Sequence, residues 1–285
     1  MKRIFKLILS IILLITNISF AEIITTNNFK IIEKHIQLAD IDTLLVFDVD
    51  DVLLQPKDLL LKSKYEHDFK TMYKQIEVQT DKTQSEKLFS FIMLQRQVEP
   101  VDQKIVKLIN EAQKKGTKVL ALTFCSTGAL GTITSLEDWR SQELKLLGYN
   151  FDQSWNNLSK KTFKQLPTIE SNKFVAFQQG IVFTGGASKA DALQIFLNYA
   201  EIKPKKILFI DDKRKNLEVV ETFANKSTIP FIGIEYTLVY DSKLTPLNRQ
   251  HAKLQLETLE KKHKWLSDQE IEQQINKDKL SKSNI

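Results

Sequence analysis

The stretch Ile41-Asp-Thr-Leu-Leu-Val-Phe-Asp-Val-Asp-Asp-Val-Leu53 decides the fold of this chain. Its first seven residues, Ile41 to Phe47, are almost all apolar, which is typical of a strand buried on both faces of a parallel sheet. The run ends abruptly in carboxylates at Asp48, Asp50 and Asp51. A buried strand followed at once by acids predicts an α/β protein with a polar site at the carboxyl edge of its sheet.

Similar segments recur along the chain and alternate with amphipathic helices. Strands are predicted at Lys118–Leu122, Lys206–Ile210 and Phe231–Ile234, and a hairpin at Phe174–Phe177 and Ile181–Phe183. Helical spacing of apolar residues predicts helices before the first of these strands and between the others, among them the helix Lys189 to Ala200. Strands that alternate with helices favour a doubly wound parallel sheet.

The pattern divides the chain into parts. Residues 22–54 and 100–240 are predicted to form the α/β core, residues 55–99 an inserted helical cap, and residues 241–285 a charged helical tail. A helix is expected to open at Pro100, with the proline near its first turn. The tail is expected to dock through its apolar residues, which are Leu254, Leu256, Leu259 and Trp265.

The N-terminal residues 1–21 have the pattern of a secretory signal peptide. Lys2, Arg3 and Lys6 precede an apolar run that is shorter than the ~20 residues needed to span a bilayer, and Ser19 and Ala21 suit signal-peptidase cleavage. The chain is therefore predicted to be exported, periplasmic or secreted, with no stable membrane span after cleavage.

Charge and cysteine content exclude some classes of protein. The formal net charge of +6 for 285 residues falls to about +3 without the signal peptide, so nucleic-acid binding is not implied. The single cysteine, Cys125, cannot form an intramolecular disulfide. It is expected to be a small buried apolar group without a catalytic role.

Charged and polar side chains stand at the predicted ends of separate strands or in the turn before a helix. They are Asp48, Asp50, Thr123, Lys189, Asp211 and Asp212. Because the carboxyl ends of parallel strands meet at one edge of a sheet, we expect these groups to converge. Carboxylates gathered in one cleft repel one another and need a cation, and oxygen ligands without a His or Cys cluster favour Mg²⁺ over zinc.

These residues make four motifs along the chain: Asp48 and Asp50 after a strand, Thr123 after a strand, Lys189 near a helix start, and Asp211 and Asp212 after a strand. In this order, they resemble the motifs of the haloacid dehalogenase-like hydrolase superfamily. The resemblance covers Leu44 to Ile234, and Leu44-Leu-Val-Phe-Asp-Val-Asp-Asp-Val-Leu53 is its most specific piece. In detail the chain looks most like a helical-capped branch found in intracellular bacterial pathogens. The resemblance implies the Rossmann-like core of that superfamily and a phosphatase acting on a small phosphorylated substrate.

The resemblance also implies a role for each site residue. Asp48 would attack phosphorus and form an aspartyl-phosphate, and Asp50 would act as general acid and base in an environment that raises its pKa. Thr123 would hydrogen-bond the phosphate, and Lys189 would neutralise charge on the nucleophile and the phosphate. Mg²⁺ would be held by Asp48, the Asp50 carbonyl and Asp211, with Asp212 either a further ligand or a neighbour of the ligands.

Several alternatives stay open at the level of sequence. Lys160, Lys161 and Lys173 compete with Lys189 for the role of the site lysine. After Thr123, the segment Phe124–Gly128 lacks the Asn-Arg or Gly-Arg pair of many phosphatase relatives, which leaves the substrate undefined. A binding or effector module with weak or no catalysis, and a phosphotransferase, are the alternative functions.

Overall fold

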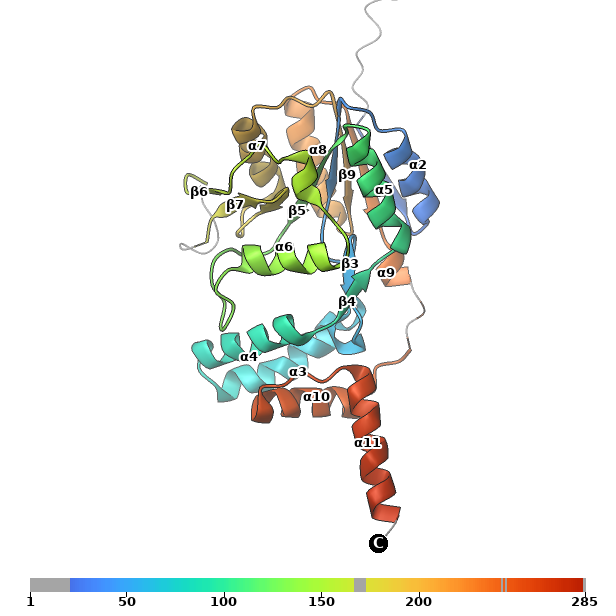
Figure 1. Cartoon of the computed structure of the whole chain (residues 1–285), viewed down its shortest axis with the longest axis vertical. Helices are drawn as coiled ribbons and strands as arrows, with labels where there is room; N and C mark the ends of the chain where they lie inside the picture. Colours follow the sequence, from blue (N-terminus) through green and yellow to red (C-terminus); the bar gives the residue numbers. More distant parts are fainter. Residues whose placement is uncertain (1–20, 167–172, 242, 244, 284–285) are drawn as a thin grey trace, which may run out of the picture.

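The computed structural model describes residues 21–166, 173–241, 243 and 245–283. The predicted signal peptide, apart from Ala21, lies outside the described residues. The described chain is a mixed α/β protein with a mostly parallel eight-stranded sheet in the order β1-β10-β9-β2-β5-β8-β7-β6 (Figure 1). The prediction of an α/β fold around a parallel sheet is confirmed at this level.

The strands of this sheet are β1 (Glu22–Thr26), β2 (Thr43–Phe47), β5 (Lys118–Thr123), β6 (Lys161–Phe163), β7 (Val175–Gln178), β8 (Ile181–Phe183), β9 (Lys206–Asp211) and β10 (Phe231–Tyr236). Along the sheet, β1, β10, β9, β2, β5 and β8 each pair in parallel with the next. Strand β7 pairs antiparallel with both β8 and β6. The predicted hairpin is therefore present as β7 and β8. Strands β3 (Leu54–Pro56) and β4 (Val98–Pro100) form a separate antiparallel ribbon.

Strand β2 occupies the place where the strand order reverses. All five of its residues are buried, and Phe47 pairs with Ala121 of β5 on one side and Ile210 of β9 on the other. The chain continues from β2 to β5 and β8 in one direction, and then returns to β9 and β10 on the opposite side. In open parallel sheets, ligands bind beyond the carboxyl ends of the strands at such a reversal, and Asp48 follows β2 there.

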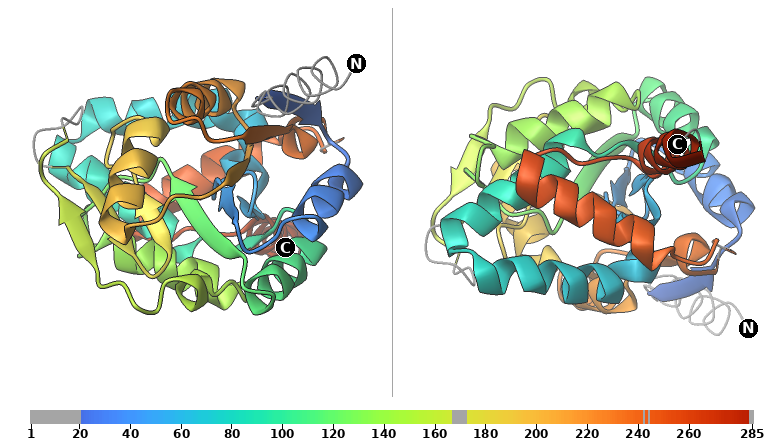
Figure 2. Two further views of the ribbon diagram at one scale, coloured as in Figure 1. Left: turned by 90° about the horizontal axis from the view of Figure 1, so that it is seen from above. Right: turned by 90° about the horizontal axis from the view of Figure 1, so that it is seen from below.

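Helices cover both faces of the sheet. One buried cluster joins α2 (Phe29–Gln37), α5 (Gln103–Lys114) and α6 (Leu136–Leu146) to the sheet, and another joins α7 (Lys189–Ala200) and α8 (Arg214–Lys226) to it. Figure 2 shows these helices around the strands from above and below. The two apolar faces explain why the central strands read as unbroken apolar runs.

The helix predicted to open at Pro100 begins at Gln103 instead. Pro100 ends β4 and pairs with Leu54, and the side chain of Asp102 accepts a hydrogen bond from the Lys104 N–H at 2.8 Å. A side-chain cap of this kind satisfies a backbone donor that the first helical turn leaves unpaired. Asp102 therefore sets the helix start, and the proline belongs to the ribbon.

Two edge strands, β1 and β6, are not part of the sequence prediction. β1 pairs with β10 over five residues, and β6 is a three-residue strand with Lys161 and Thr162 exposed. Both stand at the edges of the sheet, where a short strand needs apolar residues on one face only. Their sequences therefore lack the apolar run that predicts a central strand.

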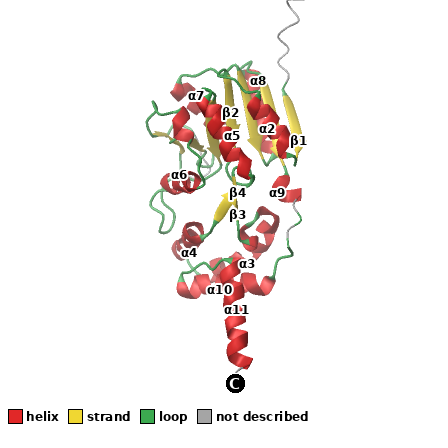
Figure 3. Ribbon diagram, turned by 45° about the vertical axis from the view of Figure 1, so that its right-hand side comes forward, coloured by secondary structure: helices red, strands yellow, loops and turns green. Residues whose placement is uncertain are grey.

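The remaining helices form a separate layer, visible below the sheet in Figure 1 and from another side in Figure 3. They are α3 (Glu66–Gln79), α4 (Lys82–Gln95), α10 (Arg249–Lys262) and α11 (Asp268–Ser283). The short helix α9 (Leu238–Asp241) lies beside the sheet instead, where Leu238 packs against the cluster that contains α2 and α5. Leu256, Leu259 and Trp265 pack with residues of α3 and α4 in one buried cluster, so the tail docks on the inserted helices. Within the described residues, no helix has both the length and the apolar character needed to cross a bilayer.

Candidate functional site

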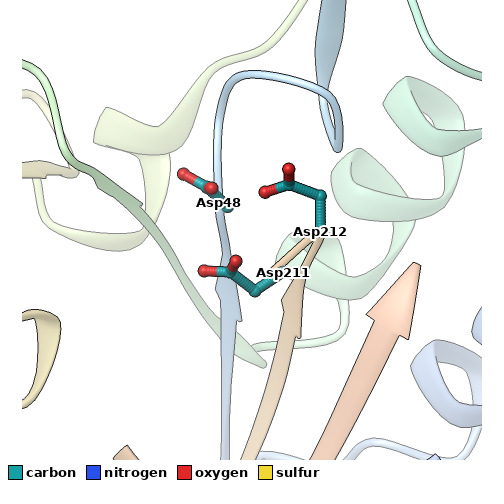
Figure 4. Close-up of side chains that lie close together, drawn as sticks. All are labelled: Asp48, Asp211 and Asp212. Atoms are coloured by element: carbon teal, nitrogen blue, oxygen red, sulfur yellow. The ribbon is translucent and has the colours of Figure 1, made fainter. Parts of the chain in front are cut away.

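Three aspartates from two neighbouring strands meet at the carboxyl edge of the sheet. Asp48 follows β2, Asp211 ends β9, and Asp212 comes next along the chain. One carboxylate oxygen of each lies within 4.8 Å of the other two, and all three residues are buried (Figure 4). The parallel pairing of β2 with β9 produces this meeting, because it aligns the ends of strands that are far apart in the sequence.

Lys189 lies between two of these acids. Its Nζ is 2.8 Å from Asp48 Oδ1 and 2.6 Å from Asp211 Oδ2, and the residue is only 2% exposed. The lysine begins α7, whose N-terminal cap is the Ser188 side chain. An ammonium so deeply buried is stable only with charged partners, and Asp48 and Asp211 keep the pKa of Lys189 raised against the opposing effect of burial.

The rival lysines lie elsewhere. Lys160 and Lys161 are exposed, and Lys173 donates hydrogen bonds to the carbonyls of Thr127 and Ala129 at 2.8 and 3.2 Å. Among the lysines named from the sequence, Lys189 is therefore the one that the structure places beside Asp48.

Asp211 and Asp212 are held differently by their neighbours. Asp211 accepts hydrogen bonds from the backbone N–H of Lys213 at 2.8 Å and from Asn216 Nδ2 at 3.0 and 3.1 Å. Asp212 Oδ2 accepts a hydrogen bond from the Tyr240 hydroxyl at 2.5 Å. Asp212 Oδ1 is buried without a hydrogen-bond partner among the described residues. That oxygen is free to serve as a ligand.

The electrostatics of the cluster are unfavourable for three ionised acids. Burial raises the pKa of Asp48 well above its ordinary value, because the neighbouring acids add to burial and together they outweigh Lys189. Burial also raises the pKa of Asp212, despite the hydrogen bond from Tyr240. Three carboxylates facing one lysine, with one unpartnered oxygen, have the oxygen donors and the negative charge that fit a hard divalent cation such as Mg²⁺.

Asp50 lies outside this cluster, contrary to the prediction that its surroundings raise its pKa. Its carboxylate pairs with Arg140 Nη2 at 3.0 Å, and half of its side chain remains exposed. Desolvation raises the pKa of Asp50, but the guanidiniums of Arg140 and Arg96 outweigh it and hold the pKa below its ordinary value. The crowding of like charges acts on Asp48 instead of Asp50. Asp50 is therefore an ionised carboxylate in this state.

A buried network of charges supports the Asp50–Arg140 pair. Arg140 Nη1 is 2.5 Å from Glu143 Oε2, and Glu143 Oε1 accepts a hydrogen bond from Arg96 Nη2 at 2.8 Å. Arg96 follows α4 and Arg140 belongs to α6, so the network joins the inserted helices to the sheet layer. Both guanidiniums also lie over the ring of Trp139, at 5.3 and 4.6 Å from its centroid.

The sequence prediction missed Arg140, Glu143, Asn216 and Tyr240. An arginine and a glutamate on an amphipathic helix have the pattern of an exposed ion pair, and burial of this pair is a property of the packing alone. Asn216 could have been found from the sequence, because it follows Asp211 and Asp212 by about one helical turn, at the start of a predicted helix.

Thr123 ends the neighbouring strand β5, and Cys125 lies in the loop that follows it. Thr123 is fully buried, and its hydroxyl accepts a hydrogen bond from the Cys125 N–H at 3.2 Å. The structure thus places Thr123 at the same edge of the sheet, but gives it no hydrogen bond to the three acids among the described residues. Burial raises the pKa of Cys125 to about 11, so its thiol is neutral at physiological pH.

Asp51 forms part of the turn after Asp50. Its φ of +64° is uncommon for a residue with a side chain, and the Ser63 hydroxyl donates a hydrogen bond to its carboxylate. Burial raises the pKa of Asp51 to about 6. Asp50 and Asp51 together line a cavity of about 220 Å³ that extends toward α3 and α4. This cavity therefore lies between Asp50 and the helices α3 and α4.

Comparison with known proteins gives a family match and several relatives. The model of a family described as "Protein of unknown function (DUF2608)" matches residues 25–272. An uncharacterized protein of Rickettsia prowazekii is 29% identical over 285 residues, covering 97% of this chain and 100% of the relative. Proteins of Chlamydia trachomatis and Chlamydia muridarum, each named "Putative outer membrane protein", are both 24% identical over 75% and 68% of this chain, and 77% and 68% of their own lengths. No solved structure gives a significant match.

These findings overturn the resemblance to the haloacid dehalogenase-like superfamily and to its helical-capped branch. The matching family model spans most of the chain and is that of a family of unknown function, and none of the names of these relatives refers to a dehalogenase-like protein. The physical reason is that short acidic motifs at strand ends describe local chemistry, which unrelated parallel-sheet proteins can share.

Proposed function

The chain belongs to the DUF2608 family of proteins of unknown function, and from the geometry of its own site we propose that it is a Mg²⁺-dependent phosphatase that hydrolyses a phosphate monoester. The observation that carries the proposal is the meeting of Asp48, Asp211 and Asp212 around Lys189 at the reversal point of the sheet. Phosphoryl transfer depends on positioning and charge neutralisation, which such a site supplies.

Asp48 is the proposed nucleophile. Its Oδ1 accepts hydrogen bonds from the Val49 N–H at 2.7 Å and from Lys189 at 2.8 Å, which leaves Oδ2 to form the bond to phosphorus. As that bond forms, the ester P–O bond breaks and the leaving oxygen takes up a proton. Water then attacks the aspartyl-phosphate, breaks the Asp48 O–P bond and releases inorganic phosphate.

The other residues hold charge in place. Lys189 would neutralise the nucleophile and the transferring phosphoryl group, while Asn216 and the Lys213 N–H keep Asp211 oriented. Asp48, Asp211 and Asp212 would hold Mg²⁺, with the Asp50 carbonyl a further candidate ligand. When bound, Mg²⁺ would relieve the repulsion among the carboxylates and neutralise charge on the phosphate.

Asp50 is the proposed general acid and base, and its ion pair with Arg140 limits the first of these roles. As an ionised carboxylate, it is ready to accept a proton from the attacking water in the second step. It must first take up a proton to protonate the leaving oxygen. We therefore expect Asp50→Asn to slow the hydrolysis of alkyl phosphates more than that of p-nitrophenyl phosphate, whose leaving group departs as an anion.

The same ion pair favours a second candidate function, a binding or effector module of weak catalytic activity. A carboxylate that Arg140 keeps ionised at 3.0 Å is a poor acid. Such a module would retain cation binding at the three aspartates but would turn over little or no phosphate ester.

The deciding experiment is a panel of phosphate esters with Mg²⁺ or with a chelator. The proposal expects phosphate release that requires Mg²⁺ and disappears in Asp48→Asn, while Asp42→Asn, which removes an exposed acid paired with Lys205, keeps full activity. Turnover in the chelator, or in Asp48→Asn, would contradict it. Phosphate passed to added glycerol in preference to water would indicate a phosphotransferase.

We also propose that the protein is exported to the cell envelope. The pattern of residues 1–21 and the printed names of the chlamydial relatives support an exported protein of the cell envelope. The core is taken to be a doubly wound sheet, an assignment supported by α2 and α5 on one face and α7 and α8 on the other.

A further inference from the structure

A groove leads away from Asp50, the proposed general acid, along helices α3 and α4. Two cavities form it, one of about 220 Å³ beside Asp50 and Asp51 and one of about 620 Å³ farther along the helices. Both are lined by Glu66, Phe69 and Phe89, so they adjoin along these side chains and together make a groove whose inner end is at Asp50 and Asp51.

The walls of this groove are mainly apolar. Near the acids they include Leu60, Leu61, Phe69, Phe89, Ile92 and Met93. The Phe69 and Phe89 rings lie 6.4 Å apart, and 36% of Phe89 remains exposed. Because exposed apolar area of this kind is stabilised when it is covered, the walls suit an apolar ligand.

The groove follows the course of α4. On α4 its lining runs from Met93, beside the acids, to Ser85 at the far end, which corresponds to about 12 Å of helix. Charged residues gather at the far end, where Lys74, Glu77 and Glu86 belong to the lining. An extended chain fits this course better than a compact polar group.

The walls are held in place on two sides. Helix α10 packs against the opposite face of α3 and α4 through Leu256 and Leu259. The loop after β5 contacts α4, where Ser90 Oγ accepts a hydrogen bond from the Thr132 N–H at 2.9 Å. In the same loop, a Cβ on Gly131 would come within 2.4 Å of the backbone of α4, so the loop needs glycine there. The groove is thus part of the folded structure.

We propose that this groove binds the leaving group of the substrate and that this group is an unbranched apolar chain. The inference rests on the proposed function and assigns its substrate class as an alkyl- or acyl-chain phosphate monoester. A sugar or nucleoside placed against the apolar part of the lining, which includes Leu60, Phe69 and Phe89, would bury hydroxyl and amide groups against side chains that cannot hydrogen-bond them, which is costly.

The test measures kcat/KM with Mg²⁺ for butyl, hexyl and octyl phosphate and for glycerol phosphate. We expect kcat/KM to rise by about fourfold for each methylene added, which is the effect of burying one CH₂ group. Phe89→Ser should flatten this dependence and Phe89→Leu should restore most of it. Val78→Ser, which changes an exposed residue of α3 outside the groove lining, should leave it unchanged.

A separate binding measurement distinguishes failure of this inference from failure of the proposed function. The non-hydrolysing Asp48→Asn variant should bind octyl phosphate more tightly than butyl phosphate in calorimetry, and Phe89→Ser in that background should remove the difference. An active enzyme without chain-length dependence overturns the inference alone. If no ester is turned over, the proposed function fails, and equal affinities for the two phosphates overturn the groove assignment as well.

Discussion

Replacing Lys189 with methionine tests the electrostatic core of the site. The variant keeps the length of the side chain but removes an ammonium that is 2.8 Å from Asp48 and 2.6 Å from Asp211, both of them buried. Breaking a buried ion pair by removing one partner typically costs about 3–5 kcal/mol, because the remaining charge is left without compensation. For a chain of this size, that corresponds to a melting temperature lowered by about 6–20 °C.

The assay is thermal unfolding at several pH values. Lys189 lowers the pKa of Asp48, so its removal raises that pKa further in the folded state. An acid whose folded pKa is raised contributes stability at low pH that is lost as the pH rises. The difference in melting temperature between Lys189→Met and the unmodified chain should therefore be largest near neutral pH and become smaller as the pH is lowered. Added Mg²⁺ should reduce this difference at neutral pH.

The matched control is Lys205→Met. Lys205 lies 2.9 Å from Asp42, a distance close to those of the Lys189 pairs, but its side chain is 76% exposed. Exposed pairs contribute little to stability, so no measurable change in melting temperature is expected. Equal melting temperatures for the two variants near neutral pH would refute the argument that Lys189 is a buried counter-ion.

Three further changes test other parts of the structure. Asp51→Asn should stabilise the fold by an amount that grows from about pH 4 to pH 6 and stays constant above pH 6, because burial raises the pKa from 3.8 to about 6 and so penalises the ionised form by on the order of 3 kcal/mol; unfolding in urea at pH 4 to 8 measures it. Trp265→Phe removes the indole N–H donated to buried Asp58 at 2.8 Å and should cost about 1–3 kcal/mol, with faster hydrogen exchange in α10; unchanged exchange would contradict the packing of the tail. Gly131→Ala should lower the melting temperature more than Gly128→Ala, since both have positive φ but only the first brings a Cβ against the backbone of α4; equal effects would mean that this contact is absent.

Much of the sheet could be predicted from local pattern. Strands β2, β5, β9 and β10 are buried on both faces, so each appears in the sequence as an apolar run, and the acids after β2 and β9 mark where those runs end. Parallel pairing brings such ends to one edge, which is why the meeting of Asp48 with Asp211 could be expected. Edge strands β1 and β6 carry a weaker pattern and were missed.

The charge state of Asp50 could not be predicted in the same way. Asp50 and Arg140 are 90 residues apart, and Arg140 lies on a helix whose other charged residues give no sign that it is buried. The shift in the pKa of Asp50 depends on a contact of 3.0 Å that only the packing of α6 creates. The expectation of a raised pKa was wrong because it counted neighbouring acids and missed this cation.

For the C-terminal tail, too, the sequence predicted the apolar face but not its partner. Its apolar residues, including Leu256, Leu259 and Trp265, predicted a docking face, but nothing in their spacing identified helices α3 and α4 as the partner. The order of the helices and strands, and the kind of residue at each strand end, followed from the sequence because they depend on neighbours within a few positions. The partners of Asp50, the unpartnered oxygen of Asp212 and the groove beside them depend on distances of a few ångströms between distant segments, and only the tertiary structure decides those.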